Sequence, residues 1–456
     1  MRFTKRSGAG VLILAWAPAG VLGQTLQGPP PASPDAITLT EAVALALKHH
    51  PAVGEARAQL DMATGALRQA EAARFPALHS DASLARFQEP MLVAPLHGFD
   101  PNLAPSFEKN LVRGNLTLSY SIYDGGARGS RIGQAESGEA MAVAGHTKAQ
   151  VELTAQVTSV FLELLSTAEL LDAAESQRGA LESERSRVRQ FLLEGKAAQV
   201  DLLRVEAALS QSEAVEISLR SKLDLARGRL ARLTGLSAMA VMEMRFAPFR
   251  LGPRAIAPYD EALMRARTSN PDLAFARHRL AGASAGVQAA KANWYPSIAA
   301  AGTYSEFGAL EGDHALEWQG ALQVSFPLFT GGARRGEQDR ASAEERRASE
   351  ALRMAALSVE DGVEAALAGV VEARALREAL ERGVAQADEV ARIEALTLEI
   401  GSGAQTDFLR AQAALFQSRA ALAQARHGEV LAGVSLARVT GELTLSWLQE
   451  NTEVVR

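Results

Sequence analysis

The side chains that could carry out chemistry are few, and none has the spacing of a known catalytic or metal site. Among the eight histidines no pair has the spacing of zinc ligands on a helix. His49 and His50 precede Pro51, so a solvated helix end explains them better than a metal pair. No phosphate-binding glycine loop, dinucleotide-binding loop or serine nucleophile elbow is present. The sequence therefore predicts a protein that is not an enzyme and holds neither cofactor nor metal, and an enzyme is a distant third hypothesis.

Composition narrows the class of protein further. The 456 residues include no cysteine, which excludes disulfides, thiolate zinc ligands, thiol catalysis and lipid attachment to a cysteine. Aromatic residues make up only 5% of the chain, which favours long helices over a large aromatic core. The formal net charge is −6 and no basic patch stands out, so we expect no nucleic-acid partner.

The N-terminus has the pattern of a secretory signal peptide over residues 1–23. Arg2, Lys5 and Arg6 precede a short apolar run at residues 11–17, with a cleavage site expected before Gln24. An uncleaved anchor helix is the alternative, but the apolar run is shorter than the roughly 20 residues of a membrane span. Residues 24–37 are rich in proline and predict an extended linker. No other segment is apolar enough for a transmembrane helix.

Two stretches predict strands that have one apolar and one polar face. Residues 115–128 and 321–334 alternate apolar and polar positions and then reach a pair of glycines, Gly125-Gly126 and Gly331-Gly332. Glycine permits the tight turn that a change from strand to helix needs. A two-faced strand joined to a very long helix indicates a membrane barrel continued by a helical shaft.

The chain is an internal duplication. Glu41 matches Glu261 with an offset of 220, and Gly195 matches Gly401 with an offset of 206; each offset holds at many other positions. The sequence therefore predicts a first repeat at residues 38–235 and a second at residues 259–441. A linker at residues 236–258 joins the repeats, and residues 442–456 form a tail.

Each repeat follows one plan. A helix of about 35 residues ends before Pro76 or Pro296, because proline pushes the preceding residue toward extended geometry. A strand, a loop, a return strand and the glycine pair follow. The next helix of the first repeat runs from Arg128 to Glu194, and at about 1.5 Å per residue would span roughly 100 Å. Its apolar residues recur in heptads, which predicts coiled-coil packing; a plain soluble coiled coil is the alternative until the strands are considered.

The long helices reverse at two tips that share a glycine and an aspartate. Gly195 and Gly401 suit helix C-terminal caps, and Asp201 and Asp407 lie where the next helix begins. Capping alone can account for these residues. The functional alternative is that both tips form an exposed docking surface.

The strands require an oligomer. Each chain offers four strands of about ten residues, and the smallest membrane barrels have about eight strands. Open strand edges are not tolerated in lipid, so several subunits must share one barrel. Two subunits would provide eight strands, and three would provide twelve and room for a passage.

Taken together, these features resemble the TolC-like outer-membrane efflux channel family. The residues that carry the resemblance are the opening helix Leu39–Pro51, both aromatic-proline junctions, both glycine pairs, both tips and the two Thr-Gly pairs that close the repeats. It covers about residues 38–441. The fold it implies is mainly α with a small β-barrel contribution: a homotrimer sharing a 12-stranded barrel in the outer-membrane lipid, continued by an α-helical tunnel through the periplasm.

The resemblance also implies a function. The chain would be the outer-membrane channel of a tripartite efflux or type I secretion system and would conduct substrates passively. A periplasmic adaptor (a membrane fusion protein) would connect it to an inner-membrane pump of the RND or ABC type. A non-channel periplasmic coiled-coil adaptor is the alternative, although such proteins usually need only one hairpin. The sequence specifies neither the cargo nor the energy source of the pump.

The resemblance further assigns residues at the tips. The residues that would contact the adaptor are Gly195, Val200, Asp201, Leu202, Gly401, Thr406, Asp407 and Phe408. The periplasmic gate would include Asp407 and Arg410. The family's best-known gate has acids at both of these positions, so Arg410 departs from that pattern. The basic residue that ties that gate closed falls at Gly403 and is absent.

Overall fold

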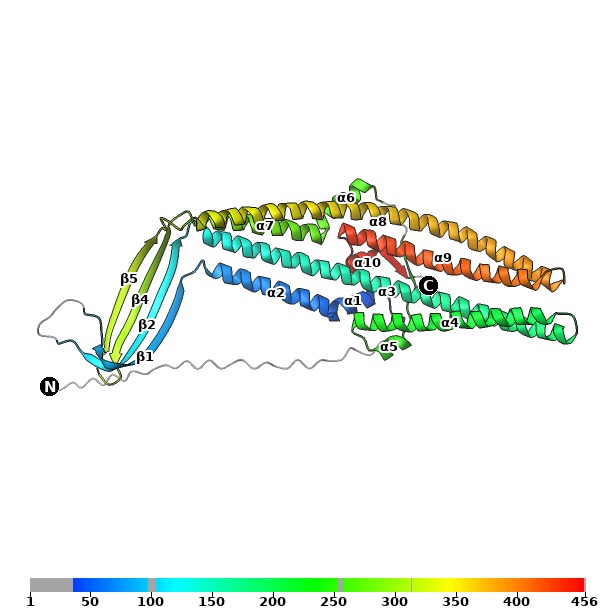
Figure 1. Cartoon of the computed structure of the whole chain (residues 1–456), viewed down its shortest axis with the longest axis horizontal. Coiled ribbons are helices and arrows are strands. Elements are labelled where there is room, and N and C mark those ends of the chain that lie inside the picture. The colour runs from blue at the N-terminus through cyan, green and yellow to red at the C-terminus, as the bar shows by residue number, and fades with distance from the viewer. Residues whose placement is uncertain (1–35, 97–103, 253–256, 313, 455–456) are drawn as a thin grey trace. The chain divides into compact units, whose positions relative to one another are not determined.

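A computed structural model of the chain describes residues 36–96, 104–252, 257–312 and 314–454 (Figure 1). The predicted signal peptide and residues 24–35 of the predicted linker lie outside the described residues. The helices are α1 (Leu39–His49), α2 (Pro51–Ala72), α3 (Ala127–Leu193), α4 (Gln199–Thr234), α5 (Ala238–Glu243), α6 (Tyr259–Ser269), α7 (Pro271–Ala292), α8 (Ala333–Glu399), α9 (Gln405–Thr440) and α10 (Leu445–Asn451). The strands are β1 (Ala77–Leu92), β2 (Phe107–Tyr123), β3 (Phe249–Leu251), β4 (Ser297–Ala309), β5 (His314–Ser325) and β6 (Thr452–Val454).

The opening helix of each repeat is broken, so the prediction of one helix of about 35 residues was wrong. His50 has extended geometry between α1 and α2, and Asn270 has the same role between α6 and α7. Each is followed by a proline, which disfavours helical geometry in the residue before it but is well suited to the first position of a new helix. The Asn270 side chain accepts hydrogen bonds from the backbone N–H groups of Asp272 and Leu273.

Four strands form one antiparallel sheet in the order β1-β2-β4-β5. The central pair, β2 and β4, joins the two repeats. The strands contain 16, 17, 13 and 12 residues, so the expected length of about ten was too short. The second return strand ends at Ser325, short of the glycine pair, where Pro327 removes a backbone donor.

The long helices match between the repeats. Helices α3 and α8 both have 67 residues, and α4 and α9 both have 36. Each long helix packs along the shorter helix that follows it, and α3 also packs against α7 (Figure 1). Val157, Leu164 and Leu181 of the predicted heptads are buried in α3, as are Val359 and Val363 in α8.

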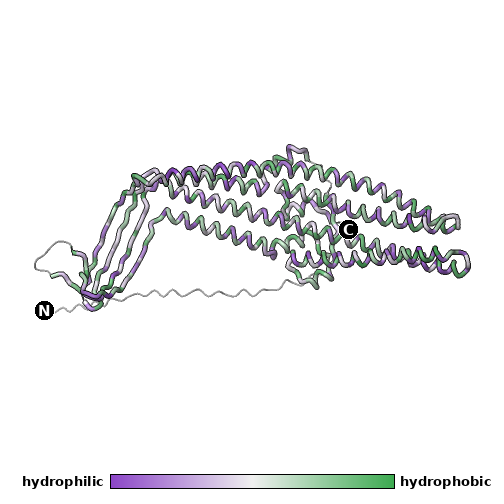
Figure 2. The backbone as a smooth tube through the Cα atoms, in the orientation of Figure 1, coloured by the Kyte–Doolittle hydropathy of each residue, from purple (hydrophilic) through white to green (hydrophobic). Residues whose placement is uncertain are grey.

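The largest apolar core lies about midway along α3. It joins α1 and α3 to the last turns of α4 and α9 and to α10, and it includes the fully buried Phe161. The segments that link and end the repeats contribute Val241, Phe249, Leu443 and Leu448 to this core, and their strands β3 and β6 pair with each other. Among the described residues no helix combines the length and the apolarity needed to cross a membrane, and Figure 2 shows apolar and polar residues interleaved along the long helices.

Candidate functional site

Both tips turn at a glycine in the left-handed region. Gly195 has φ 70° and Gly401 has φ 77°. A Cβ atom at either position would meet nothing within 4 Å, so the backbone conformation, and not a lack of space, requires glycine there. Each glycine N–H donates to a carbonyl of the preceding helix, from Gly195 to Leu192 at 3.1 Å and from Gly401 to Leu398 at 3.2 Å.

The two tip aspartates contact residues at the start of the helices that follow the turns. The Asp201 carboxylate accepts a hydrogen bond from the backbone N–H of Ala198 at 3.4 Å and contacts Arg204 at 3.2 Å. Asp407 lies in the first turn of α9 and contacts the Arg410 guanidinium at 3.5 Å. The predicted gate residue Asp407 is therefore paired with a positive charge one turn farther along the same helix.

The remaining tip residues differ in exposure. Val200 is 50% exposed, and Thr406 and Phe408 are half-buried. Leu202 is buried and packs in a cluster with Val188 and Val205, so its side chain lies inside the hairpin.

Sequence reasoning passed over the most exposed apolar side chains at the tips. Leu193 is 84% exposed and Ile400 is 77% exposed, and both lie within two residues of the turning glycines. Their signal in the sequence was a large apolar residue beside a predicted turn, where a solvated loop would have a polar one.

Sequence reasoning also missed a polar contact that connects the two hairpins. The Gln405 side-chain amide donates to the Glu184 carboxylate at 2.7 Å, and both residues are at least 91% buried. Arg187 donates two hydrogen bonds to Glu184, at 2.9 and 2.6 Å, and this contact raises the pKa of Arg187. Glu184 takes the heptad position between Leu181 and Val188, and a charged residue at a core position is the signal that could have identified it.

A second contact between the hairpins lies farther from the tips. His427 and Arg426 of α9 approach the Glu169 carboxylate of α3 at 3.6 and 3.7 Å. The approach of His427 lowers the pKa of Glu169 below its ordinary value, and the charge of Arg426 adds to the effect.

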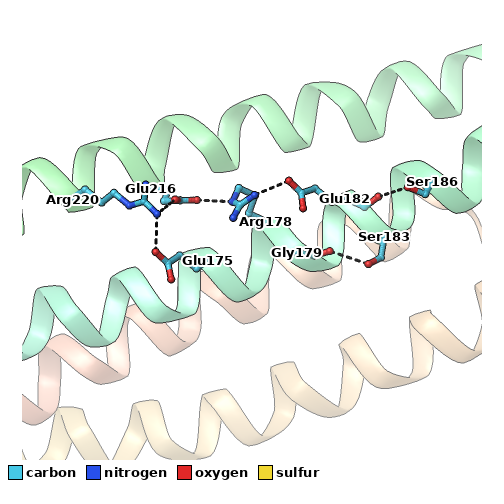
Figure 3. Close-up of polar contacts among 8 residues, drawn as sticks. All are labelled: Glu175, Arg178, Gly179, Glu182, Ser183, Ser186, Glu216 and Arg220. Carbon is cyan, nitrogen blue, oxygen red and sulfur yellow. Dashed lines mark hydrogen bonds and ion pairs between the residues drawn. The ribbon is translucent and has the colours of Figure 1, made fainter.

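The buried carboxylate of Glu216 also connects α3 and α4, the two helices of the first hairpin (Figure 3). Glu216 of α4 accepts from Arg178 of α3 at 2.7 Å and pairs with Arg220 at 2.6 Å. Arg178 and Arg220 extend the network to Glu182 and Glu175 of α3. Glu216 is only 6% exposed, so losing either arginine would leave a buried charge short of partners.

The strand-helix junctions are built alike in both repeats. Pro76 and Pro296 directly precede β1 and β4. The glycine pairs all have positive φ, from 60° at Gly331 to 92° at Gly126, with Gly125 and Gly332 between these values. After each pair, an arginine donates to the backbone of the helix end before the repeat's first strand, from Arg128 to the Ala73 carbonyl and from Arg334 to the Asn293 carbonyl.

The sheet separates apolar from polar side chains by face. Leu116 of β2 pairs with Tyr304 of β4, which pairs with Trp318 of β5, and all three are exposed. The next row belongs to the opposite face and runs from Thr117 through Thr303 to Gln319. The polar face also holds the hydrogen bond between Asn115 and Asp81, at 2.8 Å. One side of the sheet is therefore suited to lipid and the other to water.

Comparison with known proteins shows which family has this architecture. A sequence profile of the outer membrane efflux protein family matches residues 42–236 and 262–442. The chain belongs to the outer membrane efflux protein family. It is an outer-membrane protein of the TolC-like channel fold, and the alternative of a non-channel adaptor is not favoured. The family and the solved neighbours are channel proteins.

Individual relatives agree with this assignment. The chain is 25% identical over 402 residues to protein CyaE of Bordetella pertussis, covering 86% of this chain and 81% of that protein. The crystal structure of the outer membrane protein VceC of Vibrio cholerae aligns with a TM-score of 0.75 at 20% identity, covering 88% of this chain and 96% of that one. The CmeC outer membrane channel of Campylobacter jejuni aligns with a TM-score of 0.77 at 16% identity, over 90% of this chain and 88% of that one.

The part of the chain that the structure describes contains no group of three or more His, Asp or Glu side chains that could hold a metal ion.

Proposed function

We propose that this chain is the outer-membrane channel of a tripartite efflux or type I secretion system and conducts its cargo passively. The observation that supports the proposal is the four-stranded sheet, which has one apolar and one polar face and continues into two hairpins of equal helix lengths. The apolar face suits lipid, the polar face suits a water-filled passage, and the hairpins would extend that passage into the periplasm. Residues 38–235 and 259–441 would be its two repeats.

The working form would be a homotrimer. In the described sheet β1 and β5 each have only one neighbour, so two strand edges are open. Open edges are not tolerated in lipid, and three chains would close a barrel of about twelve strands with space for a passage.

The tips would be the site of coupling. A periplasmic adaptor would contact the exposed tip residues around Gly195 and Gly401, and an inner-membrane pump of the RND or ABC type would supply the energy. The large exposed side chains of Leu193 and Ile400 support a protein partner at these turns. The gate would include Asp407 and Arg410, whose charges compensate each other.

Three measurements test the proposal. The mature protein should fractionate with the outer membrane, have the native mass of a trimer in detergent and conduct ions in planar bilayers. A soluble periplasmic monomer would refute both the channel and the trimer. A trimer that never conducts, even with its tip residues substituted, would refute the passive channel while leaving the assembly intact.

A further inference from the structure

A pocket of about 460 Å³ opens where β2 ends and α3 begins, beside the last turn of α7. Ligand sites commonly have volumes of roughly 300–1,000 Å³. A Cβ atom on Gly125 would lie 2.6 Å from the Ala292 carbonyl oxygen, so α7 approaches the turn closely there. A Cβ atom on Gly126 would meet nothing within 4 Å. The polar side chains that line this pocket are those of Tyr123, Ser130, Gln288, Lys291 and Tyr295.

A β-bulge at the end of β2 places Tyr123 on the apolar face of the sheet. Exposed residues alternate along β2 as far as Ile122, yet the next residue, Tyr123, is exposed as well. The register shifts at this point, and Tyr123 pairs with Ile298 of β4. Ile298 lies on the same face as Ala300, the partner of Tyr120. Since a bulge redirects the side chain that follows it, the pocket opens beside the face that suits lipid.

Lys291 supplies the positive charge of the pocket. Its ammonium group makes no hydrogen bond or ion pair with any residue that the structure describes. The other charged groups of this turn are engaged. Arg128 donates to two backbone carbonyls, and Arg131 approaches Asp124 at 3.9 Å. The Asp124 carboxylate also accepts from the N–H groups of Gly126 and Arg128. A bound anion would therefore give Lys291 a partner that the fold does not provide.

The duplication shows that the fold does not need these polar groups. The four glycines of the two strand-helix turns have similar φ values, between 60° and 92°. At the positions that the duplication matches, the polar groups differ, with Phe329 in place of Tyr123, Phe75 in place of Tyr295 and Glu71 in place of Lys291. Two hydroxyl groups and one ammonium group thus occur at only one of the two matched junctions, which points to binding and not to the turn itself.

We propose that this pocket binds the phosphate group of an anionic phospholipid in the periplasmic leaflet of the outer membrane. Lys291 pairs with the phosphate, and the hydroxyl groups of Tyr123 and Tyr295 donate hydrogen bonds to its oxygen atoms. Tyrosine suits the boundary between membrane and water, because its ring is apolar and its hydroxyl group is polar. The inference rests on the proposed function only for placing the sheet in the membrane and the hairpins in the periplasm.

The surroundings of the pocket favour a lipid over a soluble anion. The apolar face continues from Tyr123 along the sheet, where Ile122 and Leu118 are each 48% exposed. Across β4, Ile298 pairs with Val324, which is 63% exposed. Acyl chains can lie along these side chains while the headgroup occupies the pocket, and basic pockets at a membrane surface are suited to anionic headgroups.

Native mass spectrometry of the full-length protein, purified from the outer membrane and titrated with dioleoylphosphatidylglycerol, tests the site. Lys291→Glu and the double variant Y123F/Y295F introduce the side chains found at the matched positions, so the fold should tolerate both. Lys222→Gln is the control, because Lys222 is an exposed lysine of α4 outside the pocket. Dioleoylphosphatidylcholine and inorganic phosphate serve as competing probes.

We expect Lys291→Glu to lower the occupancy of phosphatidylglycerol roughly tenfold, because it reverses the charge that the phosphate meets. Y123F/Y295F should lower it severalfold, and Lys222→Gln should match the natural protein. Phosphatidylcholine should bind more weakly, since its choline group compensates the phosphate charge. Native mass and conductance should stay unchanged in every variant, which separates a failure of the lipid site from a failure of the channel.

Three outcomes would overturn the site. These are equal lipid occupancy in Lys291→Glu and the natural protein, equal binding of the two lipids, and displacement of the lipid by excess inorganic phosphate, which would indicate a site for a free anion. If Lys291→Glu loses its native mass, Y123F/Y295F decides instead, because it keeps the charge and removes only two hydroxyl groups.

Discussion

The side-chain amide of Gln405 donates a hydrogen bond to the Glu184 carboxylate at 2.7 Å, joining the first turn of α9 to the end of α3. Because both groups are buried, separating the hairpins here would break this hydrogen bond and expose both polar groups to solvent. The matched positions of the second hairpin differ in chemistry. Val390 stands where Glu184 would be, and Ile393 stands where Arg187 would be.

We expect Gln405→Ala to loosen the contact between the two hairpins. A hydrogen bond to a charged group contributes about 1.5–3 kcal/mol, and its loss leaves Glu184 with Arg187 as its remaining partner. At about 1.4 kcal/mol per factor of ten, separated tips should become roughly ten- to a hundredfold more populated. Single-channel recording should show a higher mean conductance.

Gln199→Ala is the matched control for this variant. Gln199 begins α4 as Gln405 begins α9, but its side chain is exposed. Equal conductance in the two variants would show that the contact between Gln405 and Glu184 does not hold the tips together.

We expect Gly195→Val and Gly401→Val to impair coupling to the pump. A β-branched residue in the left-handed region costs about 1–3 kcal/mol, which should change the shape of each turn without reaching the sheet. Antibiotic sensitivity of cells should rise, while native trimer mass stays unchanged. Asparagine tolerates the left-handed region, so Gly195→Asn should retain most of the activity. Unchanged sensitivity in both valine variants would remove the docking proposal.

We expect Asn270→Ala to destabilise the chain more than His50→Ala. Asn270 is buried, caps α7 through two backbone N–H groups and donates to the Val439 carbonyl at 2.9 Å. Loss of a helix cap lowers the free energy of unfolding by about 0.5–2 kcal/mol, and the Val439 carbonyl, left without its partner, adds to this loss. His50 makes one such contact, to Ala52 at 3.2 Å. Thermal unfolding of the two variants should differ in this order, and equal midpoints would contradict the assignment.

Acid should weaken the contact between α3 and α9. Because His427 and Arg426 lower the pKa of Glu169, its contribution to stability is present above its ordinary value of 4.5 and is lost as the pH falls through the lowered value. Glu169→Gln should therefore be less stable than the natural protein at neutral pH and lose less stability on acidification. Melting temperatures measured from pH 7 to pH 3 should converge, and parallel curves would contradict the role of Glu169.

Local signals predicted much of this fold. Glycine pairs and heptads located the return strands, the 67-residue helices and the turns, because each of these signals depends on neighbouring residues, and the two constant offsets showed that the plan occurs twice. The break at His50 was missed although Pro51 was visible, since the apolar pattern continues across it. The partners of Glu184 could not be predicted, because Gln405 lies 221 residues away in the sequence and only the packing of two hairpins brings them together.

The equal lengths of the two hairpins limit how this protein can change. Leu409 of the second tip packs against the cluster of Val188, Leu202 and Val205 in the first, so both tips must reach the same level. Removing one heptad from each helix of a single hairpin would withdraw its tip by about 10 Å and break every contact there. Insertions and deletions in the shaft should therefore persist only as matched pairs, one in each repeat.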